Sequence, residues 1–477
     1  MEELFMTALD YFKEISKIPR GSGNEKAISD YMVKFAEGLG LRVKQDNANN
    51  VYIYKAATTG YENCPTVILQ GHLDMVCEKD QNTNFDFETQ GLDLIIEGDW
   101  IRAKGTTLGA DNGIAIAYQM AILADNLIKH GPIECLMTTE EETGMGGVSN
   151  LHPEYLKGKI LLNMDTDIEG EFLVSCAGGI RTKITMPIEY KPIENLVTYE
   201  IHIHDLTGGH SGAEIHHERA NANVIAGYIL SVMENKYDVN LISINGGNKD
   251  NVITRECTFE VAIPLTFECD FETNFEAMTE PCKNMYKLQD PNMKIEYKKI
   301  EKHQIISNTK LFINLIRLLP NGIQRMNHEI EGLVETSSNI GVVKTNENNI
   351  EVSISIRSST HYGKMELASK IQRLANVLGL CCKVSGDYPG WEYKSNSKIR
   401  EIAIEVYKKM YHKEPEIKAI HAGLECGFLA QKLPATDIIA FGPTVRDIHS
   451  PNERASISSM ERVYNYVKKL LEEIINY

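Results

Sequence analysis

Several common features are missing from this sequence of 477 residues, and each absence argues against a class of protein. No apolar run approaches the roughly 18 residues that a membrane-spanning helix needs. The first residues, MEELFMTALDYFKEISKIPR, carry acids early and contain no uninterrupted apolar stretch, so we do not expect a secretory signal. The net charge is −17 and no cluster of lysine and arginine stands out, so neither nucleic acid nor a membrane is an expected partner.

The ten cysteines contain no Cys-x-x-Cys pair, which disfavours a zinc ribbon or a thioredoxin-type site. Cys381 and Cys382 are neighbours in the chain, where a disulfide would be strained. Together with the missing signal, this pattern predicts a reducing, cytoplasmic compartment.

The composition and the pattern of apolar residues are typical of an α/β protein of more than one domain. Hydrophobic residues make up 43% and charged residues 24%, which is typical of a globular chain, and the length exceeds one ordinary core. Short apolar runs at 66–71, 133–139 and 160–165 have the composition of buried parallel strands. Residues 112–125 between them have a helical pattern, and such alternation predicts helices packed on a sheet.

A different pattern begins near residue 188. Strand-like segments there alternate polar with apolar residues, as in sheets with one solvated face. The α/β pattern then returns near residue 395. We therefore predict a first domain formed by residues 1–187 and 395–477, with a second, α+β domain of two related halves inserted at 188–394.

Five short segments place His, Asp or Glu beside glycine at predicted strand ends. Because the carboxyl ends of parallel strands meet at one edge of a sheet, their side chains are expected to converge. The candidates are His72, Asp111, one glutamate of 140–142, Asp165 and His449. Two imidazoles and three carboxylates suit zinc, cobalt or manganese better than magnesium or calcium. Each segment alone could be an ordinary turn, cap or solvated helix start; their joint occurrence argues for a metal site.

These segments also carry a family resemblance. GHLDMV, RAKGTTLGADNG, TEEETGMGG, CAGG, GGHSGAEI, VETSSNIGVV, YPGW, HAGLECG and GPTVRDIHSPNE run from about residue 70 to 455. The chain resembles the dinuclear-metal peptidase family that includes carboxypeptidase G, aminoacylase and cytosolic dipeptidases. The resemblance implies a zinc-exopeptidase-like catalytic domain with a mixed sheet flanked by helices, an inserted lid domain, and two divalent ions, zinc in the first place.

The resemblance assigns roles to the metal-site candidates. His72 and Asp165 would hold one ion, Glu142 and His449 the other, and Asp111 both. Asp74 would orient His72, and Glu141 would be the general base, because Gly144 sets the register of the three glutamates and leaves Glu140 without a role. The peptide bond between Asp111 and Asn112 would be cis.

The inserted domain receives roles from the same resemblance. His210 would stabilise the oxyanion, and Arg357 would pair with the substrate carboxylate, with support from Gly423 and Asn251. The expected reaction is metal-dependent hydrolysis of dipeptides, including Xaa-His and β-Ala-His types and a broader range.

Two alternatives remain open at this point. The metal ligands would equally suit an amidohydrolase or deacylase that acts on N-acyl amino acids, and a non-catalytic metal-binding scaffold is a second alternative that retention of Glu141 disfavours. The sequence leaves open whether the protein is a monomer or a homodimer, and whether His210 acts on its own or on a neighbouring subunit's site.

Overall fold

The computed structural model describes residues 6–476, which form two compact units. Unit 1 extends to Ser175 and also contains Tyr393–Ala419 and the chain from Leu424 onward; unit 2 consists of Cys176–Glu392 and Ile420–Gly423. Within the described residues, no helix is both long and apolar enough to cross a membrane.

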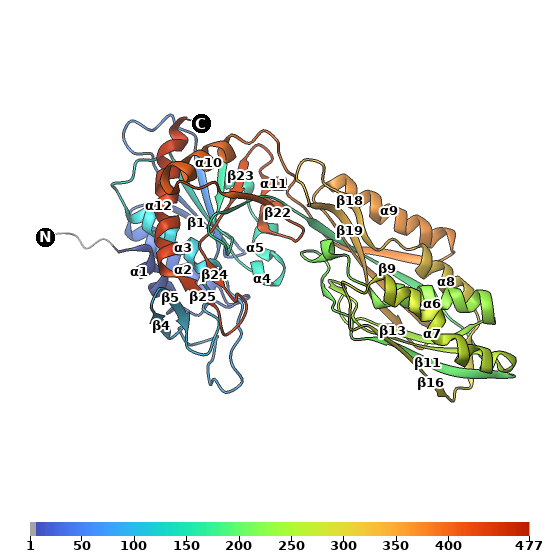
Figure 1. Ribbon diagram of the computed structural model, residues 1–477. Helices are drawn as coiled ribbons and strands as arrows, with labels where there is room; N and C mark the ends of the chain where they lie inside the picture. The colour runs from blue at the N-terminus through green and yellow to red at the C-terminus, as the bar shows by residue number, and fades with distance from the viewer. Residues whose placement is uncertain (1–5, 477) are drawn as a thin grey trace. The chain divides into compact units, whose positions relative to one another are not determined.

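The centre of unit 1 is an eight-stranded mixed sheet (Figure 1). Its strands, in sheet order, are β1 (Arg42–Gln45), β2 (Val51–Lys55), β6 (Ile133–Thr138), β3 (Val67–His72), β7 (Ile160–Asn163), β23 (Asp437–Ala440), β8 (Glu171–Cys176) and β22 (Glu416–Ile420). The four central strands β6, β3, β7 and β23 run parallel to their neighbours in this group. Every residue of β3, β6 and β7 is buried, as the apolar runs predict for parallel strands.

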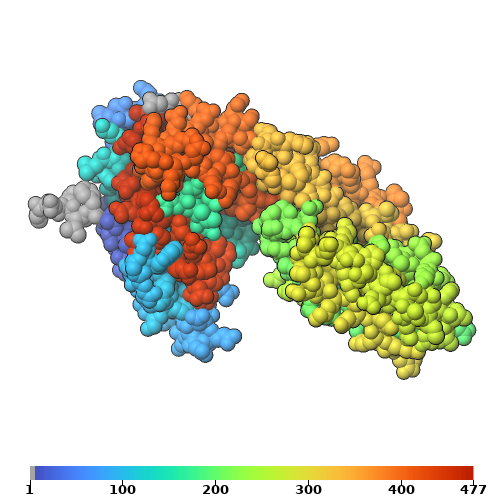
Figure 2. Space-filling model, in the orientation of Figure 1, coloured from blue at the N-terminus to red at the C-terminus, as the bar shows by residue number. Residues whose placement is uncertain are grey.

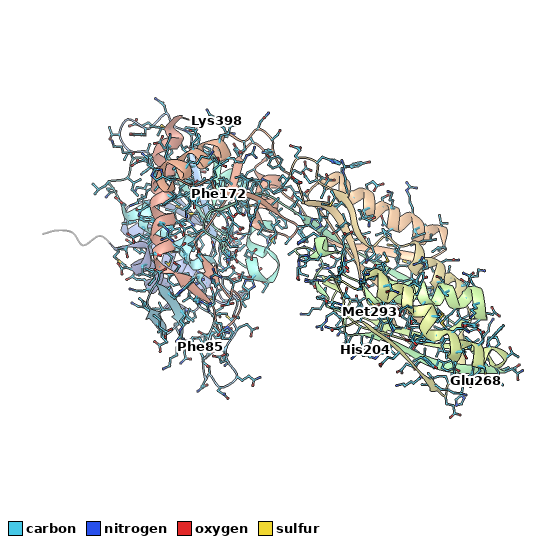
Figure 3. All side chains as sticks on the ribbon, in the orientation of Figure 1. Phe85, Phe172, His204, Glu268, Met293 and Lys398 are labelled. Carbon is cyan, nitrogen blue, oxygen red and sulfur yellow. The ribbon has the colours of Figure 1, made fainter. Side chains whose placement is uncertain are left out.

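Helices from the first and the last part of the chain pack on this sheet. They are α1 (Ala8–Ile15), α2 (Lys26–Gly38), α3 (Ala110–Ala124), α10 (Lys398–Tyr411), α11 (Glu425–Lys432) and α12 (Ile457–Glu473). The ring of Phe172, labelled in Figure 3, packs at a tilt against Phe441 and Tyr466 and edge-on against Tyr407. These aromatic contacts bring early and late segments of the chain into one core, and Figure 2 shows red C-terminal segments beside blue N-terminal ones in unit 1.

A second, small sheet in unit 1 orders the strands β24 (Val445–Arg446), β25 (Arg454–Ser456), β5 (Trp100–Ala103) and β4 (Leu94–Glu97). The loop between β24 and β25 carries His449, and β5 leads into the segment that carries Asp111. Pairing of β25 with β5 therefore brings two predicted ligands, more than 300 residues apart in the chain, into one region.

Unit 2 is built on a nine-stranded antiparallel sheet. In sheet order its strands are β16 (Lys294–Ile300), β11 (Leu196–His204), β15 (Cys257–Pro264), β13 (Asn240–Gly246), β19 (Val334–Thr345), β20 (Asn349–Ser358), β9 (Gly178–Pro187) and β21 (Cys381–Tyr388), with β18 (Gly322–Met326) also paired to β19. Helices α6 (Ala222–Tyr237), α7 (Glu268–Met285), α8 (Thr309–Leu318) and α9 (His361–Val377) form a layer over it (Figure 1).

The same order of elements occurs twice in unit 2. One half contains β11, α6, β13, β15, α7 and β16, and the other contains β9, α8, β19, β20, α9 and β21. The two halves meet where β13 pairs with β19, through Asn245 with Lys344 and Gly246 with Val343. This is the arrangement that two related halves would have; their common origin stays a prediction.

The predicted domain boundaries need correction. We placed residues to 187 in the first domain, but β9 belongs to unit 2, because its ten residues pair with β20 along their whole length and with β21 on the other side. The return to unit 1 comes at Tyr393 rather than at 395, and Ile420–Gly423 also belong to unit 2. Strand pairing over such distances leaves no trace in the local pattern of β9.

Candidate functional site

Three of the predicted metal ligands of unit 1 follow its central parallel strands. His72 is the last residue of β3, Asp165 follows β7 by two residues, and the helical turn α4 (Glu141–Gly144) follows β6. Asp111 lies in the first turn of α3, and its peptide bond to Asn112 is cis, which confirms that expectation. Parallel strands end at one edge of the sheet, so these side chains converge.

The carboxylate of Asp111 faces both histidines. Its Oδ1 lies 3.1 Å from Nε2 of His72, and its Oδ2 lies 3.3 Å from Nε2 of His449. Asp165 approaches the same nitrogen of His72 at 3.7 Å, and Glu142 approaches that of His449 at 3.1 Å. The five side chains thus divide into two pairs joined by Asp111, which is the division that the family resemblance implies.

The approach of Asp111 to His72 depends on a glycine in the strand. A Cβ on Gly71 would lie 2.4 Å from Oδ1 of Asn112 and 2.6 Å from the Cβ of Ala115, so any side chain there would push α3 away from β3. With glycine present, Oδ1 of Asn112 accepts a hydrogen bond from the backbone N–H of His72 at 3.1 Å. Gly71 therefore allows the start of α3 to lie directly against the end of β3.

Asp74 contacts both His72 and the loop that carries Glu141 and Glu142. It is fully buried, and its Oδ1 lies 3.3 Å from Nδ1 of His72. Its two carboxylate oxygens accept the backbone N–H groups of Glu141 (3.1 Å) and Glu142 (3.2 Å), and Ser22 donates a third hydrogen bond at 2.8 Å. Asp74 can therefore orient His72 and hold the loop that carries both glutamates.

The three successive glutamates face different surroundings. Glu142 reaches His449, in agreement with the register that Gly144 suggests, whereas the backbone N–H of Glu140 bonds Glu25 at 3.1 Å. Burial and the neighbouring carboxylates of Glu425, Glu142 and Asp111 raise the pKa of Glu141 to about 8, although His72 opposes this. The pKa of Glu141 therefore lies well above that of an ordinary carboxyl, as is common for groups that transfer protons near neutral pH.

The electrostatics of the cluster favour a bound cation. Burial raises the pKa of Asp165 well above its ordinary value, and the carboxylates of Asp111, Glu141 and Glu142 add to that effect against the opposing influence of His72. Hydrogen bonds to Asp111 and Glu142 raise the pKa of His449 to about 10. Donor atoms of His72, Asp111 and Glu142 all lie within 4.8 Å of one another. The donor set therefore fits divalent metal ions, which would relieve the repulsion among the carboxylates.

Two residues that the sequence did not single out hold the Asp111 segment. The carboxylate of Glu453 accepts the backbone N–H groups of Leu108, Gly109, Ala110 and Asp111 at 2.8–3.3 Å. The buried guanidinium of Arg20 donates to the carbonyls of Leu73, Asp74 and Gly109. The position of Glu453, four residues after His449 in the motif GPTVRDIHSPNE, was the available signal.

Asp74→Asn is expected to weaken metal binding without unfolding the protein. Asparagine keeps the size of the side chain but lacks the charge and one of the acceptors that hold His72 and the glutamate loop. Loss of such a partner typically costs about 10–100-fold in metal affinity. Competition with a chromophoric chelator would measure the change, and Asp46→Asn, which alters a carboxylate bonded to Asn50 and Tyr52 instead, is the control. Equal metal affinities of the two variants would contradict the role.

Unit 2 contains a second polar cluster, formed by His210, Arg357 and their neighbours. Nδ1 of His210 accepts the backbone N–H groups of Gly212 (3.3 Å) and Ala213 (3.0 Å), so the proton of the neutral ring lies on Nε2. Burial and the nearby Arg357 lower the pKa of His210, which favours that neutral form. Nε2 lies 3.4 Å from Nη2 of Arg357. Two N–H donors thus point to the same region, as in sites that bind an oxygen acceptor.

The remaining predicted residues of unit 2 are Asn251 and Gly423. The backbone carbonyl of Asn251 accepts the N–H of Ser211 at 2.9 Å, next to His210. Gly423 lies in the short segment Ile420–Gly423, together with His421, whose Nε2 lies 2.7 Å from Oγ of Ser337. Burial lowers the pKa of His421 to about 3, so this ring is neutral.

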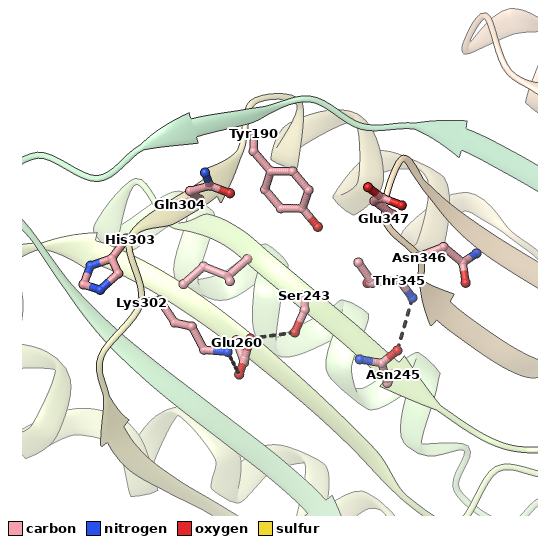
Figure 4. Close-up of a pocket in the computed structure, with 11 residues that line it drawn as sticks. Tyr190, Ser243, Asn245, Glu260, Lys302, His303, Gln304, Thr345, Asn346 and Glu347 are labelled. Atoms are coloured by element: carbon pink, nitrogen blue, oxygen red, sulfur yellow. Dashed lines mark hydrogen bonds and ion pairs between the residues drawn. The ribbon is translucent and has the colours of Figure 1, made fainter.

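A separate pocket of about 640 Å³ in unit 2 contains none of the predicted site residues (Figure 4). Two of its charged groups are paired with each other: Lys302 contacts Glu260 at 2.8 Å, and Ser243 donates to the same carboxylate at 2.8 Å. The pocket offers neither the metal-ligand set of unit 1 nor the converging donors of the His210 cluster.

Known proteins resemble this chain over almost its whole length. The sequence model of peptidase family M20/M25/M40 matches residues 68–473 of this chain. The cytosol non-specific dipeptidase of Escherichia coli (strain K12) is 36% identical over 98% of this chain and 97% of its own length. The crystal structure of aminoacylhistidine dipeptidase from Vibrio alginolyticus has a TM-score of 0.94 and 38% identity, covering 98% of this chain and 96% of that one.

A more distant structure shares the fold only. Aminopeptidase PepT from Bacillus cereus has a TM-score of 0.57 at 15% identity, with 98% of each chain covered. The extent of the family match, together with the two relatives above, establishes that this chain belongs to peptidase family M20/M25/M40.

Proposed function

We propose that this protein is a cytosolic metallo-dipeptidase. The single observation that carries the proposal is the position of Asp111, whose two oxygens face His72 and His449 while Glu141 belongs to the same cluster. A carboxylate shared by two sets of ligands, with a second carboxyl free to move protons, is the arrangement that hydrolysis at a pair of metals requires. The names of the relatives from Escherichia coli and Vibrio alginolyticus support dipeptides as the substrate class and the cytosol as the location.

The residues of unit 1 would divide the chemistry among them. His72 and Asp165 would hold one ion, Glu142 and His449 the other, and Asp111 both; the donor set suits zinc, and cobalt or manganese would also fit. When bound, the pair of ions would lower the pKa of a water molecule toward neutrality and polarise the scissile carbonyl. Glu141 would accept the proton of that water at its carboxylate and later deliver it to the leaving amine.

Residues of unit 2 would recognise the substrate. His210 carries its proton on Nε2 and would donate it as a hydrogen bond to the developing oxyanion. Arg357 would pair with the free carboxylate of the dipeptide, with Asn251 and Gly423 supporting that end. His210 and Arg357 therefore share one task, the recognition of oxygen atoms on the carboxyl-terminal part of the substrate.

The proposed substrates are dipeptides of the Xaa-His type, including β-Ala-His, together with a wider range. The first part rests on the name of the Vibrio alginolyticus relative, and the second on that of the Escherichia coli relative. Small peptides are the proposed partners, and the protein would act as a monomer or a homodimer.

One assay separates this proposal from the alternative of an N-acyl amino acid deacylase. We expect Ala-His and β-Ala-His to release histidine and N-acetylhistidine to remain intact under the same conditions. Dialysis against a chelator should abolish turnover, and zinc, cobalt or manganese should restore it. Cleavage of N-acetylhistidine with intact dipeptides would favour the deacylase, and full activity of the chelated protein would contradict the metal requirement.

A further inference from the structure

Two motifs of the sequence have no part in the chemistry proposed so far. CAGG (176–179) leads into β9, and YPGW (388–391) begins at the last residue of β21. They lie side by side, because Cys176 and Trp391 exchange two backbone hydrogen bonds of 3.0 Å each. In the sheet, Gly179 is paired with Arg357 of β20 on one side and with Tyr388 of β21 on the other.

The glycines of CAGG make room for the tyrosine of YPGW. A Cβ on Gly179 would lie 2.5 Å from ring carbons of Tyr388, and a Cβ on Gly178 would lie 2.5 Å from the carbonyl oxygen of the same residue. The ring of Tyr388 therefore lies directly over Gly179 and reaches across β9 toward β20. There its hydroxyl oxygen accepts a hydrogen bond of 2.9 Å from Nη1 of Arg357.

This contact determines which side of the guanidinium is free. Nη1 is occupied by Tyr388, whereas Nε is buried and has no hydrogen-bond partner within the described residues. Nη2 lies 3.4 Å from Nε2 of His210, but that nitrogen also carries a proton, so the two are both donors. Nε and Nη2 form one edge of the planar group, and that edge lacks an acceptor.

A glycine keeps space beside the free edge of the guanidinium. A Cβ on Gly212 would lie 2.9 Å from both Cδ and Nε of Arg357 and 2.3 Å from the carbonyl oxygen of His421. Gly212 belongs to the motif GGHSGAEI, and its lack of a side chain keeps the Nε side of the guanidinium uncrowded. Ser211, beside it, has a buried hydroxyl without a partner in the described part of the chain. Polar groups in such a state are rare unless a ligand or water satisfies them.

We propose that Tyr388 is a positioning residue that holds Arg357 by Nη1, so that the Nε–Nη2 edge receives the carboxylate of the dipeptide in two parallel hydrogen bonds. The inference rests on the proposed function of Arg357 and adds the residue that directs it. An arginine side chain that is already held in one rotamer loses less conformational entropy when the substrate binds. The free energy of binding is more favourable for that reason. Tyr388 would contact neither the scissile bond nor the carboxylate.

The test is Tyr388→Phe, with Tyr199→Phe as the matched control. Tyr199 is a fully buried tyrosine of the same unit whose hydroxyl donates to Glu272 at 3.0 Å. For each variant, kcat and KM would be measured with Ala-His and with its carboxyl-terminal amide, and thermal unfolding would verify the fold. We expect Tyr388→Phe to reduce the preference for the free acid about fivefold to tenfold, mainly through a higher KM, because a charge-assisted contact becomes less well oriented. Tyr199→Phe should leave that preference unchanged.

Arg357→Ala separates the positioning role of Tyr388 from the carboxylate-binding role of Arg357. If this variant loses the preference for the free acid and Tyr388→Phe keeps it, the positioning role is wrong while the carboxylate role of Arg357 stands. If Arg357→Ala itself keeps the preference, the proposed function of Arg357 fails and the inference fails with it. An equal loss in Tyr388→Phe and Tyr199→Phe would show a general effect of removing a buried hydroxyl and would also overturn the proposal.

Discussion

Glu141→Gln is expected to lower kcat for Ala-His by at least about 100-fold while both metal sites keep their affinity, since general acid–base catalysis contributes roughly 10²–10⁴-fold. Glutamine has the size of glutamate but cannot accept the proton of the attacking water. Glu141 is predicted to be the base and not a ligand, so its replacement should leave the five predicted metal ligands unchanged. Turnover and metal content per chain after dialysis are the two measurements.

Glu142→Gln is the matched control for this experiment. It makes the same chemical change one residue away, but Glu142 lies 3.1 Å from His449 and is a predicted ligand. We expect Glu142→Gln to lose metal from one site and Glu141→Gln to retain it. Near-normal turnover of Glu141→Gln would refute the base, and the reverse pattern of metal loss would show that the register of the three glutamates is displaced by one.

Arg357→Ala is expected to reduce kcat/KM for a dipeptide by at least tenfold, which corresponds to about 1.4 kcal/mol. The simplest alternative is that Arg357 ends a strand and pairs with an acid at the surface. In the structure its side chain is only 8% exposed, and its described contacts are Tyr388 and His210 rather than a carboxylate. Because a buried charge is costly unless it is paired, a buried guanidinium without a counter-ion in the described chain favours binding of an anionic ligand.

The carboxyl-terminal amide of the same dipeptide shows whether the lost contact is the carboxylate. The parent enzyme should prefer the free acid, and Arg357→Ala should narrow that preference. Arg181→Ala is the control, because Arg181 is an exposed arginine of the same sheet that pairs with Asp250, and exposed ion pairs contribute little. A variant at 357 that discriminates against the amide as strongly as the parent would exclude Arg357 as the carboxylate-binding residue.

Local sequence patterns were sufficient to predict the buried strands and the central helix of unit 1. The apolar runs at 66–71, 133–139 and 160–165 correspond to β3, β6 and β7, and the helical pattern at 112–125 corresponds to α3. These elements are buried on most sides, so their composition is dictated by the core and is visible without knowledge of the partners. The boundary at 187 was wrong because β9 is assigned by its pairing with β20 and β21, more than 150 residues away.

The amino-acid sequence by itself determined which residue types are available for the chemistry of this protein. The order of motifs indicated the family, the ligand types and the glutamate register, because side chains that follow neighbouring parallel strands, such as those of His72 and Asp165, meet at one edge of the sheet. It also indicated that a second domain interrupts the first, since the periodicity of its strands differs from that of the flanking segments.

Only the tertiary structure decided which atoms face one another. That Glu453 holds the segment of Asp111, that Asp74 joins His72 to the glutamate loop, and that Tyr388 holds one nitrogen of Arg357 are contacts between residues that are distant in the chain. Each depends on the register of paired strands and on glycines such as Gly71 and Gly179, which permit an approach that any side chain would block. Hydrogen bonds of this kind are selected by three-dimensional fit, for which no local sequence pattern exists.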